Sequence, residues 1–286
     1  MKQFIKILLV TCILIICVVL YSRYIAINGL ITNEIVINSD NMPDSYNGLK
    51  IVHFSDLHYT RVITDKRIIE IKNEINLINP DIVVFTGDLI DSDKDITIDE
   101  KEFLIDNLSN INSKYGKYAI IGNHDYANNY EEIIDIYANS DFILLDNDYD
   151  IIYNENKDKI FIGGVSSSSQ EINDLDKTMT YFKEDNVSDI YKLLLIHEPD
   201  FADSIVNKYN DIDLILAGHS HGGQVRLPIF GALYTPKGGE KYIMGHYILN
   251  DTSLYVSSGI GVSRYNFRLF NTPSINFYRI NKTTDQ

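Results

Sequence analysis

The amino-acid sequence predicts an α/β domain with mixed sheets, preceded by one apolar helix, and three observations support this. Short, continuous apolar runs recur along the chain, and such runs are typical of strands covered on both faces. Segments with helical spacing of apolar residues lie between them, and strands that alternate with helices indicate an α/β fold. The later part, residues 253–280, contains more strands than helices, so we expect the sheets to be mixed.

The composition limits the possible functions. The 286 residues suffice for a sizeable core. The formal net charge of −15 disfavours binding to nucleic acid, and it would repel a phosphate substrate unless bound cations reversed the charge locally. Both cysteines, Cys12 and Cys17, lie in the N-terminal apolar run, so we expect neither a disulfide nor a thiolate metal site in the folded part.

The N-terminal segment predicts a membrane anchor. Lys2 and Lys6 precede an uncharged, nearly all-apolar run over residues 7–21, and residues 4–5 extend it toward the roughly 20 residues that cross a hydrocarbon core. A cleaved signal peptide has the same layout, but residues 21–24 do not form the small-x-small pattern of a cleavage site. We therefore favour an uncleaved anchor.

The flanking charges predict the orientation of this anchor. Lys2, Lys6 and the amino terminus outweigh Arg23, which places the N-terminus in the cytoplasm and the folded domain outside a membrane that the chain crosses once. We divide the chain into an anchor at 1–23, a juxtamembrane linker at 24–33 and a folded domain at 34–286.

Within the folded domain, residues 34–38 have strand character and residues 39–48 are rich in loop-forming residues. Five further apolar runs, each ending in polar residues, are predicted as strands: 49–54, 82–85, 118–121, 193–196 and 212–217.

Helices are predicted between these strands. Thr64 can cap the first of them and Pro80 can end it, and one face carries Ile68, Ile71, Ile75 and Ile78. Further helices are expected over residues 98–111, 130–137 and 199–209.

The polar residues at the five strand ends are candidates for a metal site. Ligands collect beyond the carboxyl ends of strands in open α/β sheets. Imidazole and carboxylate ligands suit Zn²⁺, Mn²⁺ or Fe²⁺, whereas an all-oxygen set would favour Mg²⁺ or Ca²⁺. The five clusters are Asp56-x-His58, Gly87-Asp88 with Asp91, Gly122-Asn123-His124-Asp125, His197, and Gly218-His219-Ser220-His221.

Each cluster taken singly has a simpler interpretation. Asp56 and His58 would lie on one side of an extended strand end, but a surface pair would look the same. Asp88 could cap a turn. The glycines around His219 and His221 allow close backbone approach, which makes that cluster more specific. The order of all five clusters along the chain is what favours a shared site.

This order resembles the calcineurin-like metallophosphoesterase superfamily, whose motifs are complete here, and the resemblance covers roughly residues 34–280. Residues 51–58, 197–200 and 218–228 look like a bacterial membrane-associated subgroup. Its members are commonly assigned as phosphodiesterases or as UDP-2,3-diacylglucosamine pyrophosphatase-like enzymes. Pro273-Ser274 departs from the Pro-Glu expected in relatives, away from the metal motifs.

The resemblance implies a four-layer α/β/β/α sandwich with two mixed sheets and a centre of two divalent ions, Mn²⁺, Fe²⁺ or Zn²⁺, with Mn²⁺ favoured. One ion would be held by Asp56, His58 and His221, the other by Asn123, His197 and His219, and Asp88 would bridge them. His124 would face the substrate and stabilise charge or protonate the leaving oxygen, with Asp125 orienting it.

The expected reaction is metal-dependent hydrolysis of a phosphodiester or pyrophosphate bond. Two cations about 3.5–4 Å apart clamp phosphoryl oxygens and lower the pKa of a shared water, which attacks phosphorus in line. The anchor suggests a lipid-linked or cell-envelope substrate. Three alternatives stay open: a phosphomonoesterase with the same centre, a dinuclear hydrolase of amide or lactone bonds, and a non-catalytic metal-binding membrane module.

Other polar residues have less specific interpretations. We expect His53 to be a hydrogen-bonded core residue, His246 to lie in a loop and Asp91 to support the ligands without binding metal. Glu198 and Asp200 suggest a helix start. A locally basic stretch contains Arg226, Lys237, Lys241, Arg264 and Arg268, and it is either a phosphate-facing rim or a solvated surface.

Overall fold

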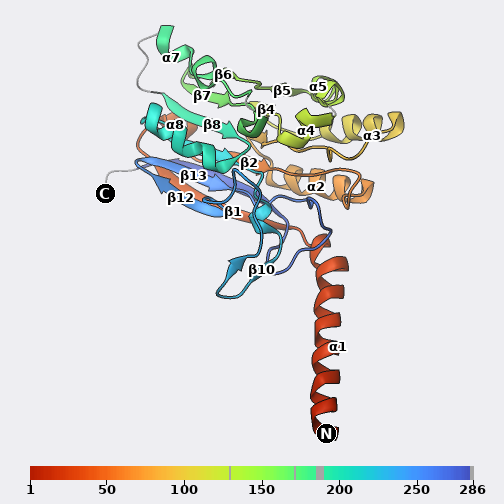
Figure 1. Ribbon diagram of the computed structural model, residues 1–286. Helices are drawn as coiled ribbons and strands as arrows, with labels where there is room; N and C mark the ends of the chain where they lie inside the picture. The colour runs from red at the N-terminus through yellow and green to blue at the C-terminus, as the bar shows by residue number, and fades with distance from the viewer. Residues whose placement is uncertain (129, 171, 185–189, 284–286) are drawn as a thin grey trace.

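The computed structural model describes residues 1–128, 130–170, 172–184 and 190–283, and within these ranges the chain forms two six-stranded mixed sheets and one small hairpin (Figure 1). The first sheet has the order β1 (Ile31–Ser39), β14 (Ser274–Lys282), β2 (Leu49–Phe54), β3 (Ile82–Phe85), β4 (Gly116–Ala119) and β5 (Phe142–Leu144). Within it β14 runs antiparallel to β2, and the other neighbours are parallel.

The second sheet has the order β12 (Gly245–Leu249), β13 (Thr252–Val256), β9 (Leu214–Ala217), β8 (Tyr191–Ile196), β7 (Lys159–Gly164) and β6 (Asp148–Tyr153). Its two outer pairs are antiparallel and its central strands are parallel. The hairpin consists of β10 (Arg226–Leu227) and β11 (Gly231–Ala232). The prediction of an α/β fold with two mixed sheets is confirmed.

Three hydrophobic clusters hold the sheets and helices together, as the continuous apolar strands predict. One cluster joins the first sheet to α2 (Asp65–Ile78), α3 (Ile98–Ser109) and α5 (Tyr130–Asn139). A second lies between the two sheets. The third joins the second sheet to α6 (Leu175–Thr178), α7 (Tyr181–Glu184) and α8 (Ala202–Lys208).

The helix boundaries follow local chemistry. The Thr64 side chain accepts a hydrogen bond from the Arg67 backbone N–H, so the predicted cap of α2 is confirmed. The segment predicted as one helix over 199–209 divides into a 3₁₀ turn, Pro199–Phe201, followed by α8. A short helix that was not predicted, α4 (Asn123–Asn128), follows β4 and contains three residues of the predicted Gly122-Asn123-His124-Asp125 cluster.

The N-terminal helix α1 (Lys2–Tyr24) projects from the domain (Figure 1) and is long and apolar enough to cross a membrane. Its last turn docks on the domain: the Ser22 hydroxyl donates to the Arg268 carbonyl at 2.8 Å, and the Arg268 N–H donates to the Ser22 carbonyl. Residues 31–33, which fall within the predicted linker at 24–33, form the start of β1 and pair with β14.

Candidate metal centre

The polar residues that follow five strands converge at one place between the two sheets. The strands β2, β3 and β4 are parallel neighbours in the first sheet, and β8 and β9 are parallel neighbours in the second. Their carboxyl ends therefore lie side by side. A direct contact joins the two sheets here, because the His219 backbone N–H donates to Asp56 Oδ1 at 2.9 Å.

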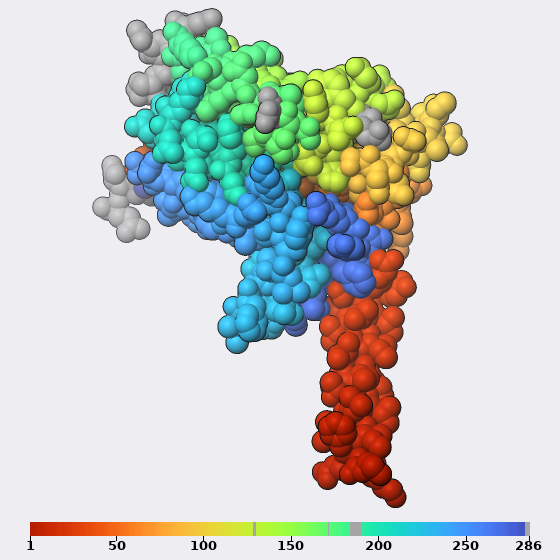
Figure 2. Space-filling view, in the orientation of Figure 1, coloured from red at the N-terminus to blue at the C-terminus, as the bar shows by residue number. Residues whose placement is uncertain are grey.

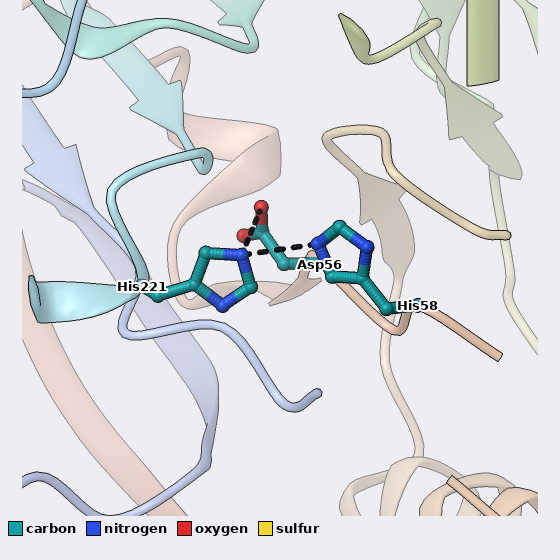
Figure 3. Close-up of side chains that lie close together, drawn as sticks. All are labelled: Asp56, His58 and His221. Atoms are coloured by element: carbon teal, nitrogen blue, oxygen red, sulfur yellow. Dashed lines mark hydrogen bonds and ion pairs between the residues drawn. The ribbon is translucent and has the colours of Figure 1, made fainter. Parts of the chain in front are cut away.

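The first group of candidate ligands consists of Asp56, His58 and His221 (Figure 3). The Nε2 atoms of the two histidines lie 3.0 Å apart, and His221 Nε2 lies 3.7 Å from Asp56 Oδ1. All three side chains are buried. Burial lowers the pKa of His58 to about 3, so its imidazole is neutral, which is the form that binds metal.

The second group contains Asn123, His197 and His219. His197 Nδ1 donates to the Thr86 carbonyl at 2.6 Å, which leaves Nε2 free to bind a cation, and Nε2 lies 3.1 Å from Asn123 Oδ1. His219 Nε2 donates to the Lys237 carbonyl at 2.9 Å, which leaves Nδ1 as its free ligand atom. Hydrogen bonds to carbonyls thus select the ligating nitrogen of both rings.

Asp88 lies between the two groups. Its Oδ2 atom is 3.5 Å from His58 Nε2 and 3.2 Å from His197 Nε2. Its Oδ1 atom accepts a hydrogen bond from the His124 N–H at 2.9 Å. Burial raises the pKa of Asp88, but His197 and the neighbouring imidazoles outweigh burial and hold that pKa well below its usual range.

These distances fit a pair of metal ions. Two atoms bound to one cation at about 2.0–2.2 Å lie about 3.0–3.5 Å apart in tetrahedral or octahedral geometry. The nitrogen and oxygen pairs above span 3.0–3.7 Å. The seven residues supply imidazole, carboxylate and one neutral amide, a donor set that suits borderline divalent ions.

The backbone around the site is unusual. Five of the seven candidate ligand residues have positive φ angles between 44° and 69°: Asp56, His58, Asp88, His219 and His221. A non-glycine residue rarely adopts this region, and such strain concentrates at functional sites. Gly122 is required by close approach, because a Cβ there would lie 2.2 Å from Asp88 Oδ1.

His124 lies beside the ligands on α4. Its Nδ1 atom is 3.2 Å from Asp91 Oδ1 and 3.0 Å from Ser92 Oγ. Burial lowers the pKa of His124, but the carboxylates of Asp88 and Asp91 raise it more, to about 9. With its Nδ1 proton held by Asp91, Nε2 is the atom that can exchange a proton with a substrate.

The carboxylate of Asp125, which we expected to orient His124, contacts backbone N–H groups. Asp125 accepts hydrogen bonds from the N–H groups of Asp88, Gly122, Leu89 and Ile90 at 2.7–3.3 Å. It therefore holds the β3 and β4 loops together. The sequence did not reveal that Asp91 would contact His124. Which carboxylate reaches the His124 ring depends on the direction in which α4 presents that ring.

Arg61 is a residue that the sequence did not single out. Its guanidinium pairs with Asp91 and lies 2.8 Å from Asp93, which fixes Asp91 between Arg61 and the rings of His58 and His124. Asp91 is thus close to the ligands, as predicted. No local motif marks Arg61, because its ion pairs with Asp91 and Asp93 join two loops that are separate in the sequence.

The remaining histidines lie away from the ligand set. His53 is buried, and its Nε2 is 2.8 Å from Thr86 Oγ1, so the prediction of a hydrogen-bonded core residue is confirmed. The prediction that His246 lies in a loop is wrong, because His246 lies on β12 and its ring stacks on Tyr255.

The acidic residues after β8 bind other loops. Glu198 is buried and accepts hydrogen bonds from the Ser167 hydroxyl and the Ser168 N–H. Asp200 accepts from backbone N–H groups of residues 240–242.

A cavity of about 690 Å³ opens from the metal centre toward α1. Asp88, Asn123 and His124 line one part of its wall, and Val18 and Val19 of α1 line another. Of the predicted basic stretch, Lys237 and Arg264 line this cavity, whereas Lys241 pairs with Asp203 and Arg268 is buried.

The chain belongs to the calcineurin-like phosphoesterase family, whose model matches residues 49–223. The matched segment contains the seven candidate ligands and His124. Members of this family are metal-dependent phosphoesterases, and the clustered ligands agree with that class.

Similar proteins come from bacteria and animals. The uncharacterized metallophosphoesterase YkuE of Bacillus subtilis (strain 168) is 31% identical over 264 residues, 92% of this chain and 90% of that protein. A transmembrane protein with metallophosphoesterase domain from Danio rerio is 28% identical, and the match covers 80% of this chain and 52% of that protein. The crystal structure of the calcineurin-like phosphoesterase YfkN from Bacillus subtilis matches 74% of this chain and 82% of its own, with 16% identity and a TM-score of 0.45.

Proposed function

We propose that this protein hydrolyses a phosphodiester or pyrophosphate bond with two divalent metal ions. Asp56, His58 and His221 would hold one ion, and Asn123, His197 and His219 the other. The single observation that carries this proposal is the position of Asp88 Oδ2, within 3.5 Å of imidazole nitrogens from both groups. An oxygen in that position would be shared by the two groups of residues that would hold the ions.

The cations, when bound, would supply positive charge for the phosphoryl oxygens and favour ionisation of the attacking water. The protein's own residues provide the rest. Asn123 contributes an oxygen without adding negative charge, so the centre keeps a net positive charge in an acidic protein. His124, held by Asp91, would donate a proton to the leaving oxygen or stabilise charge on the phosphoryl group.

We also propose that α1 anchors the protein in the cell membrane, with the domain on the extracytoplasmic side. The length and apolar composition of α1 support a membrane span, and relatives from Danio rerio and Bos taurus are named as transmembrane proteins. A lipid-linked or cell-envelope substrate follows from this placement, because the cavity extends from the metal centre to α1. The UDP-2,3-diacylglucosamine pyrophosphatase-like activity is one such reaction.

A substrate panel tests the reaction class. Purified protein loaded with Mn²⁺ should hydrolyse bis-(p-nitrophenyl) phosphate faster than p-nitrophenyl phosphate. Preference for the monoester would favour a phosphomonoesterase, and hydrolysis of amides or lactones alone would favour the other class of dinuclear hydrolase. Loss of all hydrolysis with both ions bound would indicate a non-catalytic module.

A further inference from the structure

The hairpin of β10 and β11 exposes apolar side chains at its tip. The turn residues are Pro228, Ile229 and Phe230, where polar residues and glycine usually form such turns. Ile229 is fully exposed and Phe230 is 81% exposed. Leu233 and Tyr234, just beyond β11, are exposed as well. Grouped apolar side chains of this kind mark surfaces that bind a membrane or another protein.

The backbone at the tip adds a second unfavourable feature. Ile229 has a φ of 73°, a left-handed conformation that a β-branched side chain rarely adopts. Asparagine or glycine would suit this position in water better. Ile229 is therefore both strained and exposed, and burying its side chain in an apolar medium would offset that cost.

The position of the hairpin indicates which medium this is. Figure 2 shows the hairpin as a lobe that projects from the domain on the side where α1 leaves it, pointing along α1. In Figure 1 the tip of the hairpin and the upper part of α1 lie at a similar level. Both elements would thus meet the same face of a bilayer.

The residues of α1 that line the cavity independently indicate how deep the cavity would lie in a membrane. Val18 and Val19 line the cavity, and they lie two to three residues before Tyr21, where the apolar run of α1 ends. At a rise of 1.5 Å per residue this is about 3–5 Å inside the apolar run. Tyr265, which also lines the cavity, is exposed. If α1 spans a bilayer, the mouth of the cavity lies at the bilayer boundary.

Two arginines lie over aromatic rings that line this cavity. Arg23, at the end of α1, lies over the Phe267 ring, and Arg264 lies over the Tyr234 ring at 5.2 Å. Arginine and tyrosine are typical of membrane interfaces.

We propose that residues 228–230 insert into the leaflet that surrounds the C-terminal end of α1 and form a second membrane contact, so that the cavity opens directly to the lipid. The proposal rests on the anchoring role proposed for α1. The partner that covers the apolar tip of the hairpin is thus the outer part of a lipid bilayer. A substrate could then reach the metal centre while its apolar part stays in the membrane.

Fluorescence quenching in lipid nanodiscs tests this contact with the full chain. An environment-sensitive fluorophore is attached to one cysteine at a time: native Cys17 in a Cys12→Ala chain, or Ile229→Cys or Ile98→Cys in a Cys12→Ala, Cys17→Ala chain. Ile98 is the matched control, an exposed isoleucine on α3, which lies away from the hairpin in Figure 1. The nanodiscs contain phosphatidylcholine, phosphatidylglycerol and a lipid with a doxyl quencher near the top of its acyl chain.

Loss of fluorescence at positions 17 and 229, but not at 98, is the expected result. Quenching at 17 with none at 229 would overturn the hairpin contact and leave the anchor intact. A probe at 229 that is shielded from water but not quenched would indicate a protein partner or a second copy, and would also overturn the proposal. Absence of quenching at all three positions would overturn the anchor as well. Hydrolysis of bis-(p-nitrophenyl) phosphate by the same samples tests the metal centre separately.

Discussion

At the scale of single residues, hydrogen bonds decide which atoms are free to bind metal. Carbonyl partners occupy one nitrogen of His197 and one of His219, and the His124 N–H occupies one oxygen of Asp88. The free nitrogen of His197 and the free oxygen of Asp88 lie 3.2 Å apart. A nitrogen lone pair and a carboxylate oxygen this close repel each other unless a cation or a proton lies between them. The site therefore attracts positive charge.

The role of His124 can be separated from metal binding. His124→Ala should leave both ions bound and reduce kcat by roughly 10²–10⁴-fold, the usual contribution of a general acid. Metal content and steady-state rates on bis-(p-nitrophenyl) phosphate check this, with His246→Ala on β12 as the control. Full activity of His124→Ala would show that the proton comes from another group.

His53 should make stability depend on pH. Burial lowers its pKa to about 3, against about 6.5 in an unfolded chain. Between these values the unfolded chain binds a proton that the folded chain does not, so the stabilisation is complete above pH 6.5 and is lost as the pH falls toward 3.

This dependence can be measured against His53→Gln. The free energy of unfolding of the wild type should fall relative to the variant by at most about 1.4 kcal/mol per pH unit in this window. Urea unfolding of both proteins with a chelator present gives the comparison. A difference that does not change with pH would contradict the assignment.

At the scale of elements, the segment between β13 and β14 links α1 to the metal centre. Buried Arg268 donates to the carbonyls of Ser258, Gly259 and Gly261, and its backbone pairs with Ser22 of α1. The N–H of Gly261 donates to the Asp56 carbonyl. Burial lowers the pKa of Arg268 to about 9, so the guanidinium stays charged at neutral pH.

Loss of the Arg268 side chain should therefore destabilise the domain. Arg268→Ala removes hydrogen bonds from a buried charged group, and we expect a loss of about 2–4 kcal/mol. Arg279→Ala breaks a partly exposed ion pair with Glu34 and should cost less than about 1 kcal/mol. Denaturant unfolding compares the two variants, and equal losses would contradict the role given to Arg268.

The strands β2, β3, β4, β8 and β9 and the polar clusters that follow them were predictable because they depend on local patterns. Each cluster follows a continuous apolar run. Parallel strands bring their carboxyl ends together, and this does not depend on the conformation of the loops between them. Contacts between distant loops were not predictable in this way. The partner of His124 is Asp91 because Asp125 turns toward the backbone of the β3 loop. The bond between the Ser22 hydroxyl of α1 and the Arg268 carbonyl joins residues from opposite ends of the chain.

At the scale of the whole molecule, the metal ions would join the two sheets. Ligands from β2, β3 and β4 belong to the first sheet, and ligands from β8 and β9 belong to the second. Cations that bind the folded state alone stabilise it by mass action. The net negative charge of the protein would also attract the cations, in addition to their coordination by the ligands.

Metal removal should accordingly lower the melting temperature. At about 100-fold excess over Kd, each ion adds about 2.7 kcal/mol, which corresponds to a shift of roughly 5–10 °C for a chain of this size. Calorimetry with a chelator, followed by Mn²⁺ addition, measures the shift. An unchanged melting temperature would show that the ions do not bridge the sheets.

Electron paramagnetic resonance of the Mn²⁺-loaded protein tests the shared carboxylate most directly. We expect two Mn²⁺ ions per chain with the spectrum of a spin-coupled pair, because one oxygen of Asp88 faces both ligand groups. Asp88→Ala should lose this coupled signal together with hydrolysis, whereas Asp148→Ala on β6 should keep both. A single uncoupled Mn²⁺ in the wild-type protein would contradict the dinuclear centre.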